Sequence, residues 1–305
     1  MNAADRLFYT AFLALCGAGW GFTQPMSKIA VSTGHPPVGL IFWQLVIGAA
    51  LMAVVCVLRG VALPLRRNHL KLYVILALIG TIIPNTGSYQ AIAHLPSGIV
   101  SILLSMIPML AFPISLALGL DRFEWRRVAG LLIGLIAVLL IAVPGQDLNS
   151  ALPVFWLGVV LFVCLCYASE GNYVARWGTQ GLDALQVLFG ASLVGALIAL
   201  PLAVSTGQWI NPIRPWAAPE WALVASSVAH VCVYAGYVWL VGKAGPVFAV
   251  QISYMVTLFG LFWAKLILAE AYAPMIWVAL ALMLVGMYLV QPRAVAMQDD
   301  PEAKA

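Results

Sequence analysis

The sequence has 305 residues and a net charge of +4, and 63% of its residues are apolar while 9% are Asp, Glu, Lys or Arg. Soluble domains carry about 25% charged residues, so this composition excludes a soluble globular protein, and a mean hydropathy of +1.00 favours a lipid bilayer as its surroundings. The basic residues form short clusters rather than one continuous face, so we expect no nucleic-acid partner. The five cysteines lie in apolar stretches without the spacing of a metal site, so we expect no metal and no other cofactor.

A helix that spans a bilayer needs roughly 20 mainly apolar residues, because each residue rises about 1.5 Å and the hydrocarbon layer is about 30 Å thick. Ten segments of the chain meet this requirement. They are 8–31, 38–58, 70–92, 96–120, 127–144, 153–176, 184–204, 219–241, 246–269 and 273–291. The first is too long for the core of a cleaved signal peptide, so we expect it to be kept as the first helix.

The basic residues predict the orientation of these helices. Short cytoplasmic loops are enriched in Lys and Arg, and ten spans place alternate loops on the same side of the membrane. Of the 15 Lys and Arg residues, all but Lys28, Arg214 and Lys265 fall on one side. We therefore predict a multi-pass protein with both termini in the cytoplasm.

The second half of the chain repeats features of the first. The stretch from Tyr89 resembles the stretch from Tyr237 in its spacing of aromatic, small and turn residues, and each runs on to an acidic residue, Asp121 or Glu270, before another apolar segment. Five spans per copy is an odd number, so the second copy must be inverted, as in many secondary transporters. We predict an all-α integral membrane protein of ten transmembrane helices, with one five-helix repeat in 1–147, an inverted repeat in 148–292 and a cytoplasmic tail in 293–305.

Several motifs, taken in their order along the chain, resemble those of the ten-helix EamA-type branch of the drug/metabolite transporter (DMT) superfamily. The resemblance covers nearly the whole chain, up to about Val290. It rests on Trp20-Gly21 followed by Lys28, the Pro36-Pro37 turn, and the run from Tyr89 and Ala91 through Pro108 to Leu120-Asp121-Arg122, Trp125, Gly130 and Gly134. Gln44 departs from the arginine that is usual early in the second helix, and Asp121 departs from the usual glutamate.

The resemblance implies a carrier of the bacterial inner membrane, usually an exporter of amino acids or related metabolites. It further implies a central cavity lined mainly by the first, third, fourth, sixth, eighth and ninth spans.

Polar residues recur at helical spacing within several of these spans. Polar groups are costly in hydrocarbon, so those that occur there tend to face the bundle interior or a wet cavity. Three such stripes are Thr81, Asn85 and Ser88; Ser97, Ser101 and Ser105; and Ser226, His230, Tyr234 and Tyr237. We predict a substrate pathway formed by Trp20, Gln24, Gln44, Asn85, Tyr89, Ser101, Glu170, His230, Tyr234, Tyr237, Gln251 and Tyr254.

Most of these residues also have a purely structural interpretation. Serines at such spacing serve close helix packing, and His230 near the midplane fits either the pathway or a neutral packing histidine. Glu170 is the only carboxylate well within a span. It either reaches the interface, pairs with Arg176 or another basic group, or binds a proton that couples transport to a gradient. Lys28 and Lys265 are expected to reach the headgroups, with the outer vestibule as an alternative for Lys28.

The leading functional hypothesis is a gradient-driven exporter of small metabolites such as amino acids, aromatic or apolar ones included, that works by alternating access. No P-loop is present to hydrolyse a nucleotide, and no HExxH, GxSxG or paired-aspartate motif occurs in the spans, so we predict no enzyme and no catalytic residue. The alternatives are an exporter of hydrophobic drugs, an intramembrane enzyme, a membrane sensor or scaffold, and a channel. The small-molecule substrate, its direction of movement, the use of protons and the oligomeric state are not fixed by these patterns.

Overall fold

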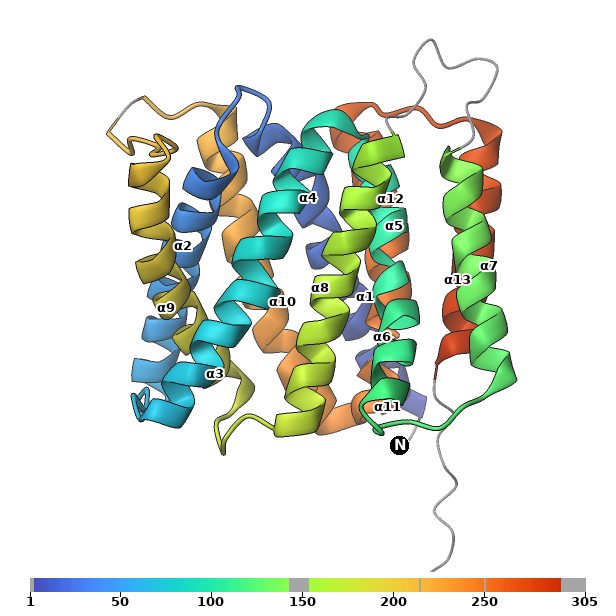
Figure 1. Ribbon diagram of the computed structural model, residues 1–305, viewed down its shortest axis with the longest axis horizontal. Coiled ribbons are helices and arrows are strands. Elements are labelled where there is room, and N and C mark those ends of the chain that lie inside the picture. Colours follow the sequence, from blue (N-terminus) through green and yellow to red (C-terminus); the bar gives the residue numbers. More distant parts are fainter. Residues whose placement is uncertain (1–2, 143–153, 214, 250, 292–305) are drawn as a thin grey trace, which may run out of the picture.

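The computed structural model describes residues 3–142, 154–213, 215–249 and 251–291. Every regular element within these residues is helical (Figure 1). In chain order they are α1 (Ala3–Ala30), α2 (Pro37–Leu58), α3 (Arg67–Ala77), η1 (Leu78–Ile82), α4 (Ile83–His94), α5 (Ser97–Leu104), α6 (Met106–Ala117), α7 (Trp125–Ala142), α8 (Val154–Trp177), α9 (Ala184–Ser205), α10 (Ala218–Ala244), α11 (Pro246–Ala249), α12 (Ile252–Leu268) and α13 (Pro274–Val290).

Helix length and surface character agree with a membrane protein. Seven helical stretches of the described chain are long and apolar enough to cross a bilayer, with α3, η1 and α4 forming one of them and α5 with α6 another. Two further apolar helices, α12 and α13, are shorter. Large apolar side chains cover the outside, such as Leu139 on α7 and Phe155 on α8, which are 64% and 70% exposed. The chain is therefore a multi-pass membrane protein.

Helix starts follow local sequence signals. Pro37, Pro219 and Pro274 occupy the first turns of α2, α10 and α13, where proline costs no hydrogen bond and its fixed φ suits a helix. Helix α9 begins with a capping box, in which the Asp183 carboxylate accepts from the Gln186 backbone N–H at 2.8 Å and the Gln186 side chain accepts from the Asp183 N–H at 3.1 Å.

The third span contains a wide helical turn, η1, between α3 and α4. The backbone N–H of Ile83 donates to the carbonyl of Leu78, five residues back, as in a π-helix. Pro84, which has no N–H, follows directly. At Gly80 in this turn, a Cβ atom would collide with the carboxylate of Glu170 from α8. The glycine therefore lets an acidic side chain approach the backbone of the third span.

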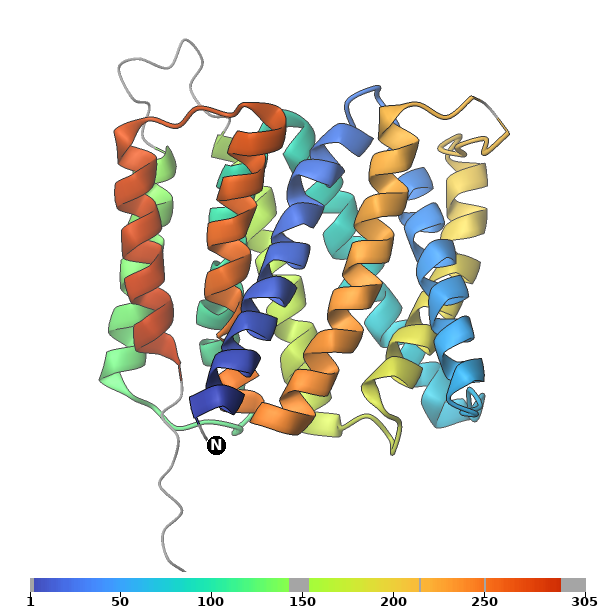
Figure 2. The same ribbon diagram turned by 180° about the vertical axis from the view of Figure 1, so that it is seen from behind.

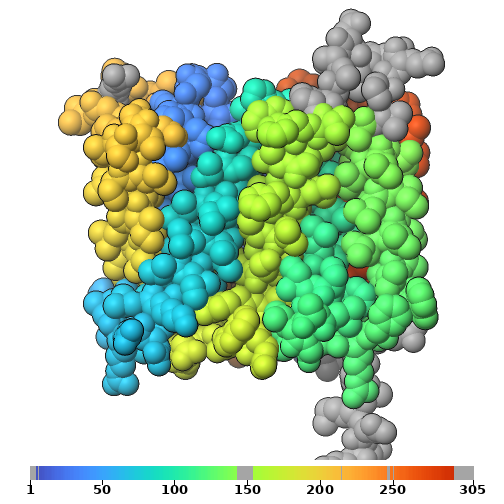
Figure 3. Space-filling model, viewed as in Figure 1, coloured from blue at the N-terminus to red at the C-terminus, as the bar shows by residue number. Residues whose placement is uncertain are grey.

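The helices pack in pairs that are far apart in the sequence. Helix α1 lies between α10 and α12, as Figure 2 shows from behind. Helix α7 packs against α13 at one edge of the molecule, and α2 packs against α9 at the other. Helix α8 lies between α3 with α4 on one side and α6 on the other (Figure 3).

The two ends of the bundle differ in charge. The loops 59–66, 118–124 and 178–183 lie at one end, here called the basic end (Figure 1), and they hold or adjoin Arg59, Arg66, Arg122, Arg126, Arg127 and Arg176. The loops 31–36, 206–217 and 269–273 lie at the other end, here called the opposite end. The basic residues in or beside loops 59–66, 118–124 and 178–183, which the sequence places on one side of the membrane, thus lie at one end of the bundle. Arg214, Arg293 and Lys304 fall outside the described residues.

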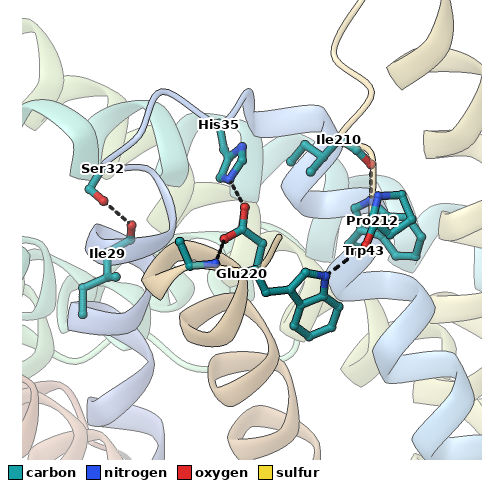
Figure 4. A network of polar contacts seen from close by, with 9 residues as sticks. Ile29, Ser32, His35, Trp43, Ile210, Pro212 and Glu220 are labelled. Atoms are coloured by element: carbon teal, nitrogen blue, oxygen red, sulfur yellow. Dashed lines mark hydrogen bonds and ion pairs between the residues drawn. The ribbon is translucent and has the colours of Figure 1, made fainter. Parts of the chain in front are cut away.

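Polar contacts hold the loops together at both ends. At the opposite end, His35 Nε2 lies 2.8 Å from the Glu220 carboxylate, and the indole N–H of Trp43 donates to the Ile210 carbonyl at 3.0 Å (Figure 4). At the basic end, Arg59 pairs with Asp183 at 2.9 Å. Each end therefore links the start or end of α2 to a helix start in the second half of the chain.

The described helices lie close to the ten expected segments. Three expected spans are divided: 70–92 into α3, η1 and α4, 96–120 into α5 and α6, and 246–269 into α11 and α12. The expected boundary between the repeats at 147 and 148, and the tail 293–305, lie outside the described residues.

The contact between α7 and α13 generates a prediction about stability. A Cβ atom at Gly130 would lie 2.7 Å from the Gly286 carbonyl oxygen, so Gly130→Ala should force the helices apart and cost about 1–3 kcal/mol. Thermal unfolding in detergent, followed by tryptophan fluorescence, should show a lower midpoint. The matched control is Gly158→Ala, whose Cβ would meet nothing within 4 Å. An unchanged midpoint for Gly130→Ala would contradict the close packing.

Candidate functional site: a polar cavity between the helices

A cavity of about 400 Å³ lies inside the bundle and is lined by several helices of both halves of the chain. Its walls combine hydroxyl, amide and aromatic groups with a few aliphatic ones, and among the described residues no Asp, Glu, Lys or Arg lines it. The lining residues are Trp20, Thr23, Gln24, Ser27, Gln44, Gly80, Thr81, Asn85, Ser88, Tyr89, Leu104, Ile107, Tyr167, Ser226, His230 and Val256. A cavity of this size and character fits a small organic solute.

One wall of the cavity is a hydrogen-bonded chain of side chains from three helices. The Gln44 side-chain oxygen on α2 accepts from the Tyr89 hydroxyl at 2.9 Å and from the Asn85 amide at 3.4 Å, both on α4. The Asn85 side-chain oxygen in turn accepts from the Tyr167 hydroxyl on α8 at 2.6 Å. Because each of these four side chains has at least one partner among the others, the wall is held in place, and it links the two halves of the chain.

The facing wall on α1 is different, because two of its polar atoms have no partner. The indole Nε1 of Trp20 and the side-chain oxygen of Gln24 are both buried and make no hydrogen bond. Their positions, i and i+4, place them on the same face of α1, and both line the cavity. Leaving such groups unpaired costs about 1–3 kcal/mol each, so this wall is suited to a solute that supplies one acceptor and one donor.

Aromatic rings surround these unpaired atoms. The Trp20 ring centroid is 5.4 Å from that of Tyr237 and 6.1 Å from that of His230, and His230 is 6.4 Å from Tyr234. Tyr234 and Tyr237 do not line the cavity themselves. They contact His230 and Trp20, which do. The aromatic cluster supplies an apolar contact surface beside the unpaired polar pair.

Glu170 lies near the cavity without lining it. Its side chain is half-buried on α8, and its carboxylate packs against the backbone of Gly80, which does line the cavity. Among the described residues, none donates a hydrogen bond to this carboxylate and none forms an ion pair with it, Arg176 included. A half-buried acid without a basic partner can take up or release a proton.

Three other residues of the predicted pathway lie elsewhere. Ser101 is 1% exposed, donates to the Ser97 carbonyl at 3.1 Å and packs closely against Gly260, so its geometry is that of a helix-packing serine. Gln251 is exposed at the start of α12. Tyr254 packs against the main apolar core, and its hydroxyl is buried without a partner. Trp20, Gln24, Gln44, Asn85, Tyr89 and His230 are the predicted residues that line the cavity, and a substrate role for all twelve stays a prediction.

Tyr167 and Thr23 are polar lining residues that the sequence patterns did not indicate. No stripe of hydroxyl or amide residues marked Tyr167, but its spacing of three residues before Glu170 puts the two on the same face of α8. Lys28 also differs from its expected place near the headgroups. Its ammonium donates to the Ile92 carbonyl at 2.7 Å at the end of α4.

A second cavity of about 330 Å³ adjoins the first toward the basic end. Both cavities are lined by Ile107 and Tyr167. The second is largely apolar, and its polar lining includes Asn172, Ser115, Gln291 and the ion pair of Asp121 and Arg127. Arg127 also donates to the Val290 carbonyl at 2.8 Å and lies over the Phe112 ring, so its charge is committed to holding α6, α7 and α13 together.

The chain matches one protein family over most of its length. The EamA-like transporter family matches twice, at residues 7–143 and again at residues 154–291. This chain belongs to the EamA-like transporter family. The EamA-type resemblance seen in the sequence is thereby confirmed, and the polar cavity lies inside the membrane-embedded part of a transporter.

The EamA-like chain resembles solved structures but no curated protein. Among curated proteins, none matches it. One solved structure, described as a crystal structure of protein, is similar with a TM-score of 0.62 over 91% of this chain and 95% of the other. The two share 19% sequence identity, so this likeness shows the fold alone.

The hydrogen-bonded wall of the EamA-like chain generates a second prediction. Tyr167→Phe removes the donor to Asn85 and should lower stability by about 0.5–1.5 kcal/mol, measured as a lower thermal midpoint in detergent. Tyr288→Phe is the matched control, because Tyr288 is 63% exposed on α13. Equal midpoints for the two variants would show that the Tyr167 hydroxyl contributes nothing to the wall.

Proposed function

We propose that this transporter is a gradient-driven carrier that exports a small zwitterionic or neutral amphipathic metabolite, an amino acid or a close relative, across the bacterial inner membrane. The observation that carries the proposal is the pair of buried, unpartnered atoms on α1, Trp20 Nε1 and the Gln24 side-chain oxygen. An indole N–H only donates, and an amide oxygen only accepts. A carboxylate and an ammonium on one carbon atom supply the two missing partners.

The remaining lining supports the same class of solute. In the part of the chain that the structure describes, no side chain with a fixed charge lines the cavity, so a solute with a large net charge would be left without compensation. The rings of Trp20, His230 and Tyr237 favour an apolar or aromatic side chain on the solute. An apolar drug fits this aromatic surface but would leave the donor and the acceptor on α1 unpaired, which favours the amino acid.

The mechanism we propose is alternating access between two inverted five-helix repeats, in 1–147 and 148–292. Its support is the two consecutive family matches and the symmetry of the helix contacts. The contact of α1 with α12 has its counterpart in the contact of α8 with α6, the contact of α1 with α10 has one in that of α8 with α4, and α7 with α13 and α2 with α9 are self-related pairs. The basic end is then cytoplasmic, the tail 293–305 lies on the same side, and the second cavity is the entry from that side.

We further propose that Glu170 carries the coupling proton. Its carboxylate has no basic partner among the described residues and touches the η1 turn at Gly80. Protonation removes a charge from this contact and so changes the balance of forces between α8 and the third span. The solute cavity borders the same turn, which gives proton and solute a shared structural element.

Transport assays in proteoliposomes test the solute class. With a panel of labelled amino acids and a hydrophobic cation, we expect uptake or efflux of one or more amino acids. Trp20→Phe and Gln24→Leu should each raise the half-saturating concentration roughly five- to thirtyfold, because each removes a hydrogen bond to a charged group worth about 1–2 kcal/mol. The control is Gln90→Leu, at an exposed position on α4. Transport of the cation alone would favour the drug exporter instead.

Proton coupling is tested by an imposed pH gradient. We expect the gradient to stimulate flux in the parent protein, and Glu170→Gln to abolish this stimulation while exchange without a gradient persists. Glu124→Gln, at an exposed position before α7, should behave like the parent. Normal stimulation in Glu170→Gln would assign coupling to another group.

A further inference from the structure

The connection between α4 and α5 at the opposite end is held by a basic residue from another helix. The Lys28 ammonium on α1 donates to the carbonyls of Ile92, Ala93 and Leu95 at 2.7, 3.1 and 3.1 Å. Carbonyls at the end of a helix have no partner within it, and they carry the negative end of the helix dipole. A lysine is therefore well matched to this position.

An acidic residue holds the other side of the same connection. The Glu270 carboxylate, which follows α12, accepts from the Ser97 backbone N–H at 2.7 Å, the Ser97 hydroxyl at 2.8 Å and the Gly98 N–H at 3.1 Å. The Tyr272 hydroxyl donates to the same carboxylate at 2.5 Å. These N–H groups begin α5, where a negative charge is favourable. Lys28 and Glu270, together with the α4–α5 connection between them, are called the clasp below.

The clasp lies next to the polar cavity. The cavity face of α1 runs through Trp20, Gln24 and Ser27, and Lys28 directly follows Ser27. On the third span, Ser88 and Tyr89 line the cavity one turn before the carbonyls that Lys28 binds. The clasp thus ties α1 and the end of α12 to α4 and α5, between the cavity and the opposite end of the bundle. Charge-assisted hydrogen bonds are about twice as strong as neutral ones, so this closure is strong.

The second half of the chain contains matching residues that are not engaged in this way. The offset of 148 residues from Tyr89 to Tyr237 carries Lys28 onto Arg176, near the basic end of α8. The corresponding connection is that between α10 and α11 at Gly245. Arg176 is exposed and has no hydrogen bond or ion pair with any other described residue. Asp121, the counterpart of Glu270, pairs with Arg127 instead.

We propose that the clasp is the latch that closes the opposite end of the cavity, and that it must release for solute to pass there. When it releases, Arg176 takes the equivalent position on the last carbonyls of α10 and closes the basic end. This inference rests on the alternating access proposed above and adds to it the residues that hold one closed state. In the proposed cycle Lys28 holds the carbonyls that end α4 in one state, and Arg176 holds those that end α10 in the other.

Thiol accessibility tests the latch without any solute. The five native cysteines are replaced, Thr23 in the cavity is changed to cysteine as a reporter, and a membrane-impermeant thiol reagent is added to right-side-out vesicles. Ser32→Cys, on an exposed loop at the opposite end, verifies the orientation. Lys28→Met and Glu270→Gln should each raise the labelling rate of the reporter at least fivefold, because each breaks one side of the clasp.

The control for Lys28 is Lys265→Met. Lys265 lies near the same end but contacts the Trp277 ring, 5.5 Å from its centroid, and makes no hydrogen bond to the clasp. The Lys265→Met variant should leave the labelling rate of the reporter unchanged. If Lys28→Met fails to insert, Glu270→Gln and Ser97→Ala, which removes one donor to Glu270, test the same closure.

The arginine is tested by the opposite change. Arg176→Ala should lower labelling of the reporter from the opposite side at least threefold, because it weakens the state in which that side is open, while Arg66→Ala, at an exposed position at the basic end, should not. Parent-like labelling in both Lys28→Met and Glu270→Gln, an equal rise in Lys265→Met, or a rise in Arg176→Ala would each overturn the latch. Labelling needs no solute, so a failure to find a transported amino acid would count against the proposed function and leave this result standing.

Discussion

Hydrocarbon offers no hydrogen bonds, and the structure is organised by the need to satisfy polar groups without water. Most backbone groups meet this need within helices. The exceptions are at helix ends, where the partners are side chains of the same helix start or of other helices. Asp183 and Gln186 cap the start of α9, Lys28 binds the carbonyls that end α4, and Glu270 binds the N–H groups that begin α5. The few charged residues of this chain are thus placed largely where helices are interrupted or terminated.

The cavity follows from the same constraint. On the side of α2, α4 and α8, the groups Gln44, Asn85, Tyr89 and Tyr167 satisfy one another. On the side of α1, Trp20 and Gln24 retain one unpaired atom each. A hydrogen-bonded wall opposite one with two unpaired atoms gives a solute a defined orientation, because polar groups on the solute gain more from the α1 side. Specificity of this kind needs no charged residue in the cavity.

The helices themselves were predictable from the sequence, because twenty apolar residues in succession have few alternatives to a span. The stripe of Thr81, Asn85 and Ser88 was predictable as a cavity face for a similar reason, and all three residues line the cavity. Ser101 has the same spacing pattern but packs against Gly260, and only the position of α12 reveals this. Tyr167 was missed because the other hydroxyl groups of α8, on Ser169 and Tyr173, do not lie at helical spacing from it. Lys28 was misplaced because its partners are backbone carbonyls 64 to 67 residues away, and backbone groups leave no trace in a residue pattern.

The wide turn at Leu78–Ile82 divides the third span into two rods, α3 and α4, with different neighbours. Helix α3 packs on α9, whereas α4 packs on α8 and its end is bound by Lys28. A π-turn interrupts the regular hydrogen-bond ladder, so bending at this point costs less than bending elsewhere along the span. Helices α3 and α4 are therefore joined by the most easily bent part of the third span, and the Glu170 carboxylate packs against this part at Gly80.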